Sequence, residues 1–313
     1  MKKKLFKIAK LIRPKQWLKN LAVYAAIIFT GQLFNITIFE KVTIGFLAFC
    51  SLSSAIYIIN DLFDIQKDRM HPFKKFRPLA HRDISVPFAI GLAVFLLIVA
   101  LILGLMVRRA FFFTLLTYLI LQVCYSLILK NIAIIDILTL ATGYMLRVYG
   151  GEFASGYHIS VWMLLTTIAL SLFLAVGKRK SELTLISHLP DTSYNSVRQS
   201  LSHYSNQLLD VYASIFATST FIFYSLFTFL ESPSFKPSIG ILLPDFLPDY
   251  FQRKWLMITI VPVVYGIMRY LQDIYEKHEG ESPERVLLSD SQLLIAVGIW
   301  AILVVIIIYT LGG

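Results

Sequence analysis

The feature that most constrains the fold is a series of apolar segments that recurs along the whole chain. Nine of them are each close to the ~20 residues that a helix needs to cross the hydrocarbon core of a bilayer. They lie at about 20–39, 41–62, 86–107, 110–129, 132–150, 159–180, 208–230, 254–274 and 292–311. With 57% hydrophobic residues, the chain is predicted to be an all-α polytopic membrane protein. We expect a bundle of nine transmembrane helices in a single domain, residues 1–313.

The first nineteen residues differ from the segments that follow them. Apolar side chains alternate with lysines over residues 1–19, which predicts an amphipathic helix lying at the membrane surface. Arg13, Pro14 and Lys15 interrupt the apolar run that a signal peptide would need. We therefore expect this interfacial helix to remain in the mature protein.

The distribution of positive charge predicts the orientation of the bundle. Of the 29 Lys and Arg residues, 22 fall in the N-terminus and in the loops on its side of the membrane. By the positive-inside rule, the N-terminus is cytoplasmic and the C-terminus lies outside the plasma (inner) membrane. The net charge of +10 sits in short loops between apolar spans, so we expect membrane lipids and phosphorylated substrates as partners and no nucleic acid. The sequence leaves the oligomeric state open, and a homo-oligomer is compatible with it.

A cytoplasmic stretch, residues 60–78, carries the most informative side chains. On a helix, Asn60, Asp64 and Asp68 fall at i, i+4 and i+8 and point the same way, with Asp61 at the edge of that face. A carboxamide and carboxylates gathered in this way suit Mg²⁺, which takes its remaining ligands from water and substrate phosphates. We predict a magnesium site.

Basic side chains follow the acids at once. Arg69, His71, Lys74, Lys75 and Arg77 suit phosphate oxygens better than they suit a metal. The whole stretch therefore predicts a metal–diphosphate site facing the cytoplasm. The alternative is a solvated charged loop that only orients its flanking helices; such a loop needs basic residues but no helical row of acids.

Further charges gather near the same membrane face. Lys178 and Glu182 are four residues apart, on one helix face beside Arg179, although a basic flank that ends a membrane helix would look similar. Tyr125 and Lys130 mark the cytoplasmic end of the fourth span. Near the N-terminus, Arg13, Lys15, Lys19 and Asn20 are placed to hold a lipid phosphate at headgroup depth.

Charges inside predicted spans are costly and therefore informative. Asp136 and Arg147 are about three turns apart in the fifth span, so both can face the interior. Arg269 and Asp273 are at i and i+4 in the eighth span. Either set is open to the simpler interpretation of a structural ion pair.

Several of these motifs together resemble one family. They are Asn-Asp-x-x-Asp-x-x-x-Asp at 60–68, Arg-Pro-Lys-Gln-Trp-Leu-Lys-Asn at 13–20, Asp68-Arg69-x-His71-Pro72 with Lys74, Arg77 and Pro78, Tyr125-Ser126 with Lys130 and Asp136, Gly177-Lys178-Arg179-x-x-Glu182, and Arg269-Tyr270 with Asp273, Gly280-Glu281 and Pro283-Glu284. The chain resembles the UbiA-type membrane prenyltransferase superfamily over nearly its whole length, and within it the phosphoribosyltransferase branch.

The resemblance implies a UbiA-like bundle and a Mg²⁺-dependent reaction. In that reaction, 5-phosphoribose passes from phosphoribosyl diphosphate (PRPP) to a polyprenyl phosphate of the decaprenyl or undecaprenyl class, and diphosphate is released. The product would supply arabinose for the cell envelope. The expected metal ligands are Asn60, Asp61, Asp64 and Asp68, and the expected catalytic residues are Asp64, Asp68, Lys178 and Glu182. The expected substrate-binding residues are Lys15, Lys19, Asn20, Arg69, His71, Lys74, Arg77, Tyr125, Lys130, Arg147, Lys178 and Arg179.

Two other functions remain open at this point. Aromatic prenyltransferases of the same superfamily use a prenyl diphosphate, but they carry a second aspartate-rich motif where this chain has the basic segment 177–182. A basic segment fits a donor with an additional phosphate. An anion transporter would also use intramembrane charges, but here the charges crowd one membrane face and no inverted repeat is evident.

Overall fold

The computed structural model describes residues 2–70, 74–187, 199–231, 255–276 and 283–311, and the regular secondary structure of this part is all helical. The α-helices are α1 (Lys2–Ile12), α2 (Ala25–Phe29), α3 (Ile36–Phe63), α4 (Ile65–Met70), α5 (Val86–Val107), α6 (Arg109–Leu127), α7 (Ile135–Ser155), α8 (Val161–Ser187), α9 (Asn206–Leu230), α11 (Ile260–Glu276), α12 (Pro283–Ser289) and α13 (Ser291–Ile306). The 3₁₀ helices are η1 (Pro14–Tyr24), η2 (Lys74–Phe76), η3 (Leu129–Asn131), η5 (Gln199–His203) and η6 (Trp255–Thr259), and η7 (Ile307–Leu311) is a π-helix.

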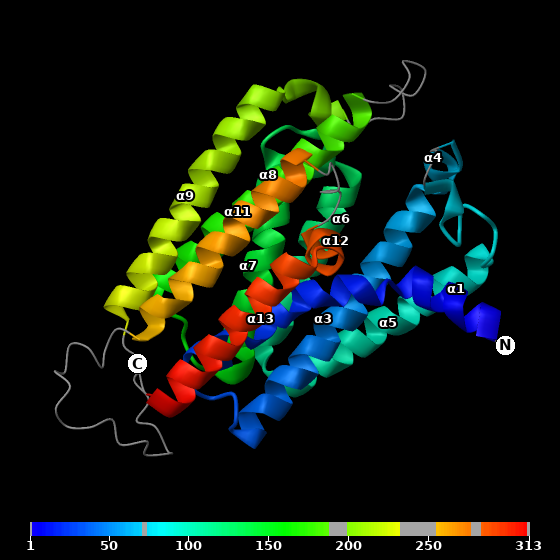
Figure 1. Ribbon diagram of the computed structural model, residues 1–313. Helices are drawn as coiled ribbons and strands as arrows, with labels where there is room; N and C mark the ends of the chain where they lie inside the picture. The colour runs from blue at the N-terminus through cyan, green and yellow to red at the C-terminus, as the bar shows by residue number, and fades with distance from the viewer. Residues whose placement is uncertain (1, 71–73, 188–198, 232–254, 277–282, 312–313) are drawn as a thin grey trace, which may run out of the picture.

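The long helices run alongside one another in one bundle, and α1 crosses it near one end (Figure 1). Seven helices among the described residues are long and apolar enough to cross a membrane: Ile36–Phe63, Val86–Val107, Arg109–Leu127, Val161–Thr184, Asn206–Leu230, Trp255–Glu276 and Ser291–Thr310. The seven candidates make this a multi-pass membrane protein, but they do not confirm the predicted count of nine. The predicted span 132–150 corresponds to α7, which is long enough but carries Asp136, Arg147 and Glu152.

The prediction of one continuous helix over 20–39 is wrong. The chain instead forms η1 and the five-residue α2, turns at residues 30–35, and begins α3 at Ile36. Two local features interrupt the helix. Gly31 adopts a left-handed backbone with φ 73°, which glycine tolerates without steric cost. Asn35 caps α3, since its side chain accepts a hydrogen bond from the backbone N–H of Ile38.

The N-terminal helix α1 docks on the end of α3 and on α5. Leu11 is fully buried in an apolar cluster with Ile58 of α3 and Ala89 of α5. The Lys7 ammonium lies 2.6 Å from the Asp83 carboxylate. That hydrogen bond from Lys7 is the main cause that lowers the pKa of Asp83. The helix therefore holds the loop before α5 against the end of α3.

A close backbone approach joins α7 to η1 at Gly151. A Cβ atom added to Gly151 would lie 1.9 Å from the carbonyl oxygen of Val23, so only glycine allows this packing. The apolar cluster beside it contains Phe49, which packs edge-to-face on Phe111 at a ring distance of 5.7 Å. This contact fixes where the non-canonical η1 segment lies.

We expect Gly151→Ala to lower the free energy of unfolding by about 1–3 kcal/mol, because the added methyl overpacks the η1–α7 contact. The measurement is thermal unfolding of the purified protein in detergent. Gly91→Ala in α5 is the matched control, since nothing lies within 4 Å of its added methyl. Equal stability of the two variants would contradict the close packing of η1 on α7.

Candidate functional site

The predicted row of oxygen ligands keeps its helical register at the end of α3. Asp64 caps the C-terminus of α3, and its N–H donates to the Asn60 carbonyl at 3.0 Å. The Asp68 N–H donates in turn to the Asp64 carbonyl at 2.8 Å. The i to i+4 spacing therefore continues from α3 into α4.

The side chains of this row turn towards two different sets of partners. The Asn60 amide oxygen accepts a hydrogen bond from the Ser126 hydroxyl at 2.5 Å. The Asp64 carboxylate lies 3.7 Å from the ammonium of Lys130, which follows α6 in η3. Asn60 and Asp64 thus face the end of α6.

Asp61 and Asp68 are instead held by arginines. The Nη1 atom of Arg77 lies 2.7 Å from Asp68 Oδ2 and 3.1 Å from Asp61 Oδ1. Nη2 of Arg13 lies 2.5 Å from the same Asp61 oxygen. Both acids are almost fully buried, at 2% and 4% exposure, so each carboxylate needs these cations for neutralisation.

Arg13 is held in place by its backbone and by Tyr57. It adopts φ 57° at the junction of α1 and η1, a conformation that is uncommon for a residue other than glycine. Its guanidinium lies 5.0 Å from the ring centroid of Tyr57. The N-terminal segment therefore contributes a fixed positive charge to the acidic end of α3.

The donors present fit Mg²⁺ in chemistry, because Asn60, Asp64 and Asp68 offer only oxygen atoms. Within the described ranges, no three His, Cys, Asp or Glu side chains converge as a metal cluster. The carboxylates of the row have different cationic partners. Asp68 pairs with Arg77, and Asp64 faces Lys130. The protein's own cations neutralise these carboxylates.

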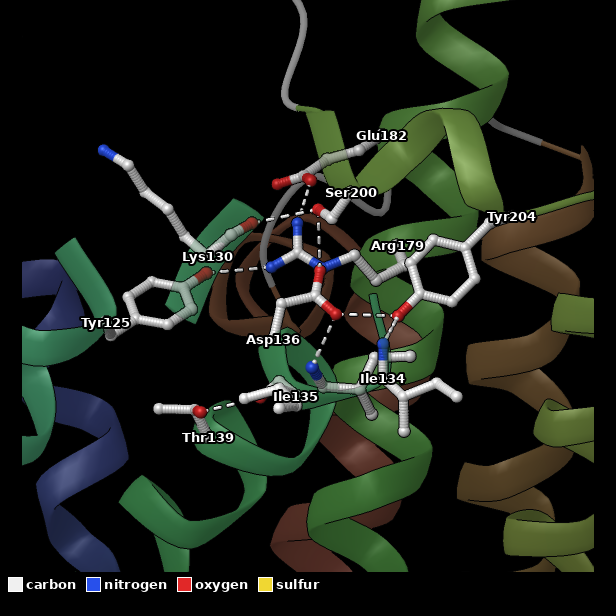
Figure 2. A network of polar contacts seen from close by, with 11 residues as sticks. Tyr125, Lys130, Ile134, Ile135, Asp136, Thr139, Arg179, Glu182, Ser200 and Tyr204 are labelled. Carbon is white, nitrogen blue, oxygen red and sulfur yellow. Dashed lines mark hydrogen bonds and ion pairs between the residues drawn. The ribbon is translucent and has the colours of Figure 1, made fainter. Parts of the chain in front are cut away.

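A second polar cluster surrounds Arg179 of α8 (Figure 2). The guanidinium is fully buried, and its Nε lies 2.8 Å from Asp136 Oδ2 at the start of α7. Nη1 donates to Glu182, one turn further along α8, and Nη2 donates to the Tyr125 hydroxyl at 2.9 Å. The Arg179 guanidinium thus has two carboxylates, those of Asp136 and Glu182, and the Tyr125 hydroxyl as partners.

Asp136 is also bound from the loop before α9. The Tyr204 hydroxyl donates to Asp136 Oδ1 at 2.7 Å, and the Ser200 hydroxyl lies 3.1 Å from Oδ2 (Figure 2). Burial, and then the hydrogen bond to Asp136, raise the pKa of Tyr204, which keeps the hydroxyl protonated as a donor. Ile134, whose backbone has φ 69° and ψ −49°, donates its N–H to the Tyr204 hydroxyl at 2.6 Å. A β-branched residue rarely adopts that conformation, so the local backbone is strained.

The end of α6 joins the two clusters. Ser126 binds Asn60, and the adjacent Tyr125 binds Arg179. Lys130 also contacts both clusters. Its ammonium faces Asp64, and its carbonyl oxygen lies 2.9 Å from the Ser200 hydroxyl, which in turn contacts Asp136. The structure therefore brings the acidic end of α3 and the Arg179 cluster of α8 to the two sides of one short segment.

Asn20 and Arg147 form a third buried cluster, closer to the middle of α7. The Arg147 guanidinium donates to the Asn20 amide oxygen at 2.7 Å and to the Tyr118 hydroxyl at 2.6 Å. Asp136 pairs with Arg179 instead. Asp136 and Arg147 therefore do not form an ion pair with each other, since eleven residues along a helix separate them by about 16 Å.

Arg269 also has a different partner from the one that helical spacing suggests. Arg269 pairs with Asp290, the N-cap of α13, at 2.7 Å. The predicted ion pair with Asp273 is not observed among the described residues. Asp290 comes from a segment distant in sequence, so helical spacing alone did not reveal it.

The other expected substrate-binding residues occupy varied environments. Lys15 is exposed, and the Lys19 ammonium lies 6.0 Å from the Tyr144 ring centroid. Arg69 is exposed and donates to the Ala80 carbonyl at 3.3 Å. Lys178 is half-buried on α8. His71 and the side chain of Lys74 lie outside the described residues.

Sequence reasoning missed several members of these clusters. Ser200 and Tyr204 have no motif or spacing that marks them, and they reach Asp136 only through the tertiary fold. Ser126 belongs to the Tyr125-Ser126 motif, but the sequence predicts no role for it. The sequence predicts a lipid-phosphate contact for Arg13, and only the structure shows its contact with Asp61.

Comparison with known proteins identifies similar sequences and folds. The sequence pattern of the UbiA prenyltransferase family matches residues 21–180. A protein of Corynebacterium glutamicum named decaprenyl-phosphate phosphoribosyltransferase is 33% identical over 96% of this chain and 86% of its own. The protein of the same name from Mycolicibacterium smegmatis is 31% identical over 94% of this chain and 89% of its own.

One group of solved structures has a similar fold. A UbiA homologue from Archaeoglobus fulgidus, bound to GPP and Mg²⁺, superimposes with a TM-score of 0.68. The match covers 96% of this chain and 99% of the homologue at 17% identity. At that identity the likeness concerns the helical fold alone.

We expect Asp136→Asn to lower the free energy of unfolding by roughly 3–5 kcal/mol, because it leaves buried Arg179 without one of its counter-ions. Asparagine keeps acceptors for Tyr204 and Ser200, so the loss reports the charge. Thermal unfolding in detergent measures it.

Asp210→Asn is the matched control. It breaks the neighbouring Lys180–Asp210 pair, where the distance is 2.6 Å but the Asp210 side chain is 40% exposed. We expect a change below about 1 kcal/mol there. Equal losses in the two variants would show that the burial of Arg179 does not determine the effect.

Proposed function

The chain belongs to the UbiA prenyltransferase family, and we propose that it transfers 5-phosphoribose from PRPP to a polyprenyl phosphate with release of diphosphate. Relatives aligned over nearly the whole chain carry the name decaprenyl-phosphate phosphoribosyltransferase. The same reaction places the enzyme in the supply of arabinose for cell-envelope polymers. The lipid acceptor is of the decaprenyl or undecaprenyl class.

One structural observation supports this function above the others. The oxygen donors of α3 and the end of α8 that carries Lys178 and Arg179 meet on either side of Tyr125 and Ser126. A donor with a diphosphate at one end and a further phosphate at the other needs two such charged regions close together. A prenyl diphosphate has one charged end only.

In the proposed site, Asn60, Asp64 and Asp68 would hold Mg²⁺. Bound there, the metal supplies positive charge that neutralises the departing diphosphate. Arg77 and Lys130 contact these carboxylates, so their cationic groups lie where donor phosphates must come. They provide preorganised stabilisation of the leaving group.

The structure refines the roles of the α8 residues. The fully buried Arg179 binds Asp136, Glu182 and Tyr125, so we propose that it positions Glu182 and Tyr125 and does not itself reach the donor. Lys178, half-buried on the same helix, is the side chain that we assign to a phosphate of the donor.

The chemistry at the sugar needs little proton transfer. The bond from the anomeric carbon to the diphosphate breaks while a phosphate oxygen of the lipid forms the new bond, through a transition state with oxocarbenium character. The lipid phosphate is already an anion, so no general base is required. We assign Lys15 and Lys19, at the start of η1, to binding the lipid phosphate.

We also propose that the chain crosses the membrane nine times. The first additional crossing is the helical segment formed by η1 and α2. With α7, it adds two crossings to the seven candidates. The site then faces the cytoplasm, as does the N-terminus, and the C-terminus lies outside.

An aromatic prenyltransferase is the second candidate, because the structural neighbour of similar fold was bound to GPP and Mg²⁺. We expect the purified enzyme to transfer label from PRPP to polyprenyl phosphate and not to use prenyl diphosphates as donors. Thin-layer chromatography of the lipid products measures both. Turnover with prenyl diphosphates alone would refute the proposed function.

We expect Asp64→Asn or Asp68→Asn to lower transfer by at least about a thousandfold, since a ligand of the metal and its charge are lost. Membrane insertion should be unchanged, as shown by the yield of folded protein in detergent. Asp83→Asn is the control, because its carboxylate pairs with Lys7 away from the site and full activity is expected. Near-normal turnover of either variant with Mg²⁺ would contradict the metal assignment.

A further inference from the structure

We infer that Arg77 is an internal counter-ion that neutralises Asp61 and Asp68 until the donor arrives. As a consequence, the site takes up a divalent cation together with the donor diphosphate and hardly at all without it. This inference rests on the proposed function, and it adds an order of binding that the function alone does not require.

The geometry of Arg77 is the first argument. A single guanidinium nitrogen, Nη1, bridges Asp68 at 2.7 Å and Asp61 at 3.1 Å. A cation shared by two carboxylates in this way takes the place of a bridging metal ion. A divalent cation and Arg77 therefore compete for the same carboxylate oxygens.

Charge balance is the second argument. Among the described residues, the carboxylates of Asp61 and Asp68 face the guanidiniums of Arg13 and Arg77, and the charges of these four groups sum to zero. A divalent cation added alone would leave two surplus positive charges among buried groups, which is costly in a poorly hydrated environment. A diphosphate brings the negative charge that removes this cost.

Of the two arginines, Arg77 is the one that leaves the carboxylates when the donor binds. Arg13 stacks on Tyr57 at 5.0 Å and stays with Asp61. Among the described residues, the Arg77 guanidinium has only the two carboxylates as partners, and its side chain is 28% exposed. It follows the short η2 and can turn to the donor phosphates, which breaks its contact with Asp68.

The affinity of the protein for a divalent cation, measured without the donor, reports the competition between Arg77 and the cation for the carboxylates. When only a fraction of the molecules has the carboxylates open, the apparent affinity falls by that fraction. If Arg77 holds them nine-tenths of the time, its removal tightens metal binding about tenfold.

The experiment titrates Mn²⁺ into the full-length protein in detergent and follows free Mn²⁺ by electron paramagnetic resonance. For the wild-type protein, we expect at least about tenfold tighter binding with PRPP than without it. Arg77→Gln should bind Mn²⁺ alone about tenfold more tightly than the wild type. Arg77→Lys keeps one charge but loses the planar bridging group, and we expect an intermediate value.

Lys67→Gln is the matched control. It removes one positive charge next to Asp68 in the sequence, from an exposed side chain of α4, and should change the affinity for Mn²⁺ alone less than about twofold. If neither Arg77 variant binds Mn²⁺ alone more tightly than wild type, the inference is overturned. The same holds if Lys67→Gln tightens binding equally.

The two proposals fail in different ways. Unchanged Mn²⁺ affinity in the Arg77 variants, with a wild-type enzyme that transfers phosphoribose, overturns the counter-ion role and leaves the function standing. A wild-type enzyme that does not use PRPP overturns the function, whatever the metal titration gives.

Discussion

Neutralisation of buried charge is the constraint on which the rest of this structure depends. A charged side chain removed from water must find an opposite charge or several hydrogen-bond partners, or the folded state loses its stability. The end of the bundle that carries Asp61 and Arg179 meets this requirement by linking helices that are distant in sequence. Arg179 of α8 joins α7 and α6, and Asp61 of α3 joins the N-terminal segment to the loop before α5.

These charge pairs also explain how a membrane bundle presents a polar reaction site. The apolar surfaces of the long helices determine that the chain enters the bilayer, but they do not align the helix ends. The short segment from Tyr125 to Lys130 does so, because it contacts the acidic end of α3 on one side and the Arg179 cluster on the other. Positions of donor-binding groups and stability of the fold thus depend on the same interactions.

The structure separates two kinds of basic residue that look alike in a sequence. Arg179 is saturated by carboxylates and a tyrosine inside the protein, which suits a residue that positions others. Arg77 is partly exposed and bridges two acids at the mouth of the proposed metal site, which suits a residue that exchanges partners during the reaction. The difference between Arg179 and Arg77 follows from their burial and from their number of partners. A sequence motif gives information on neither.

The sequence by itself determined the class of fold, the positions of most membrane helices and the register of Asn60, Asp64 and Asp68, because apolar length and helical spacing are local properties. It also identified the residues of the family motifs. Only the tertiary structure decided that η1 and α2 replace a regular first span. It also decided that Arg147 binds Asn20 and Arg269 binds Asp290. The choice among several nearby counter-charges depends on how helices pack, and that information is spread over the whole chain.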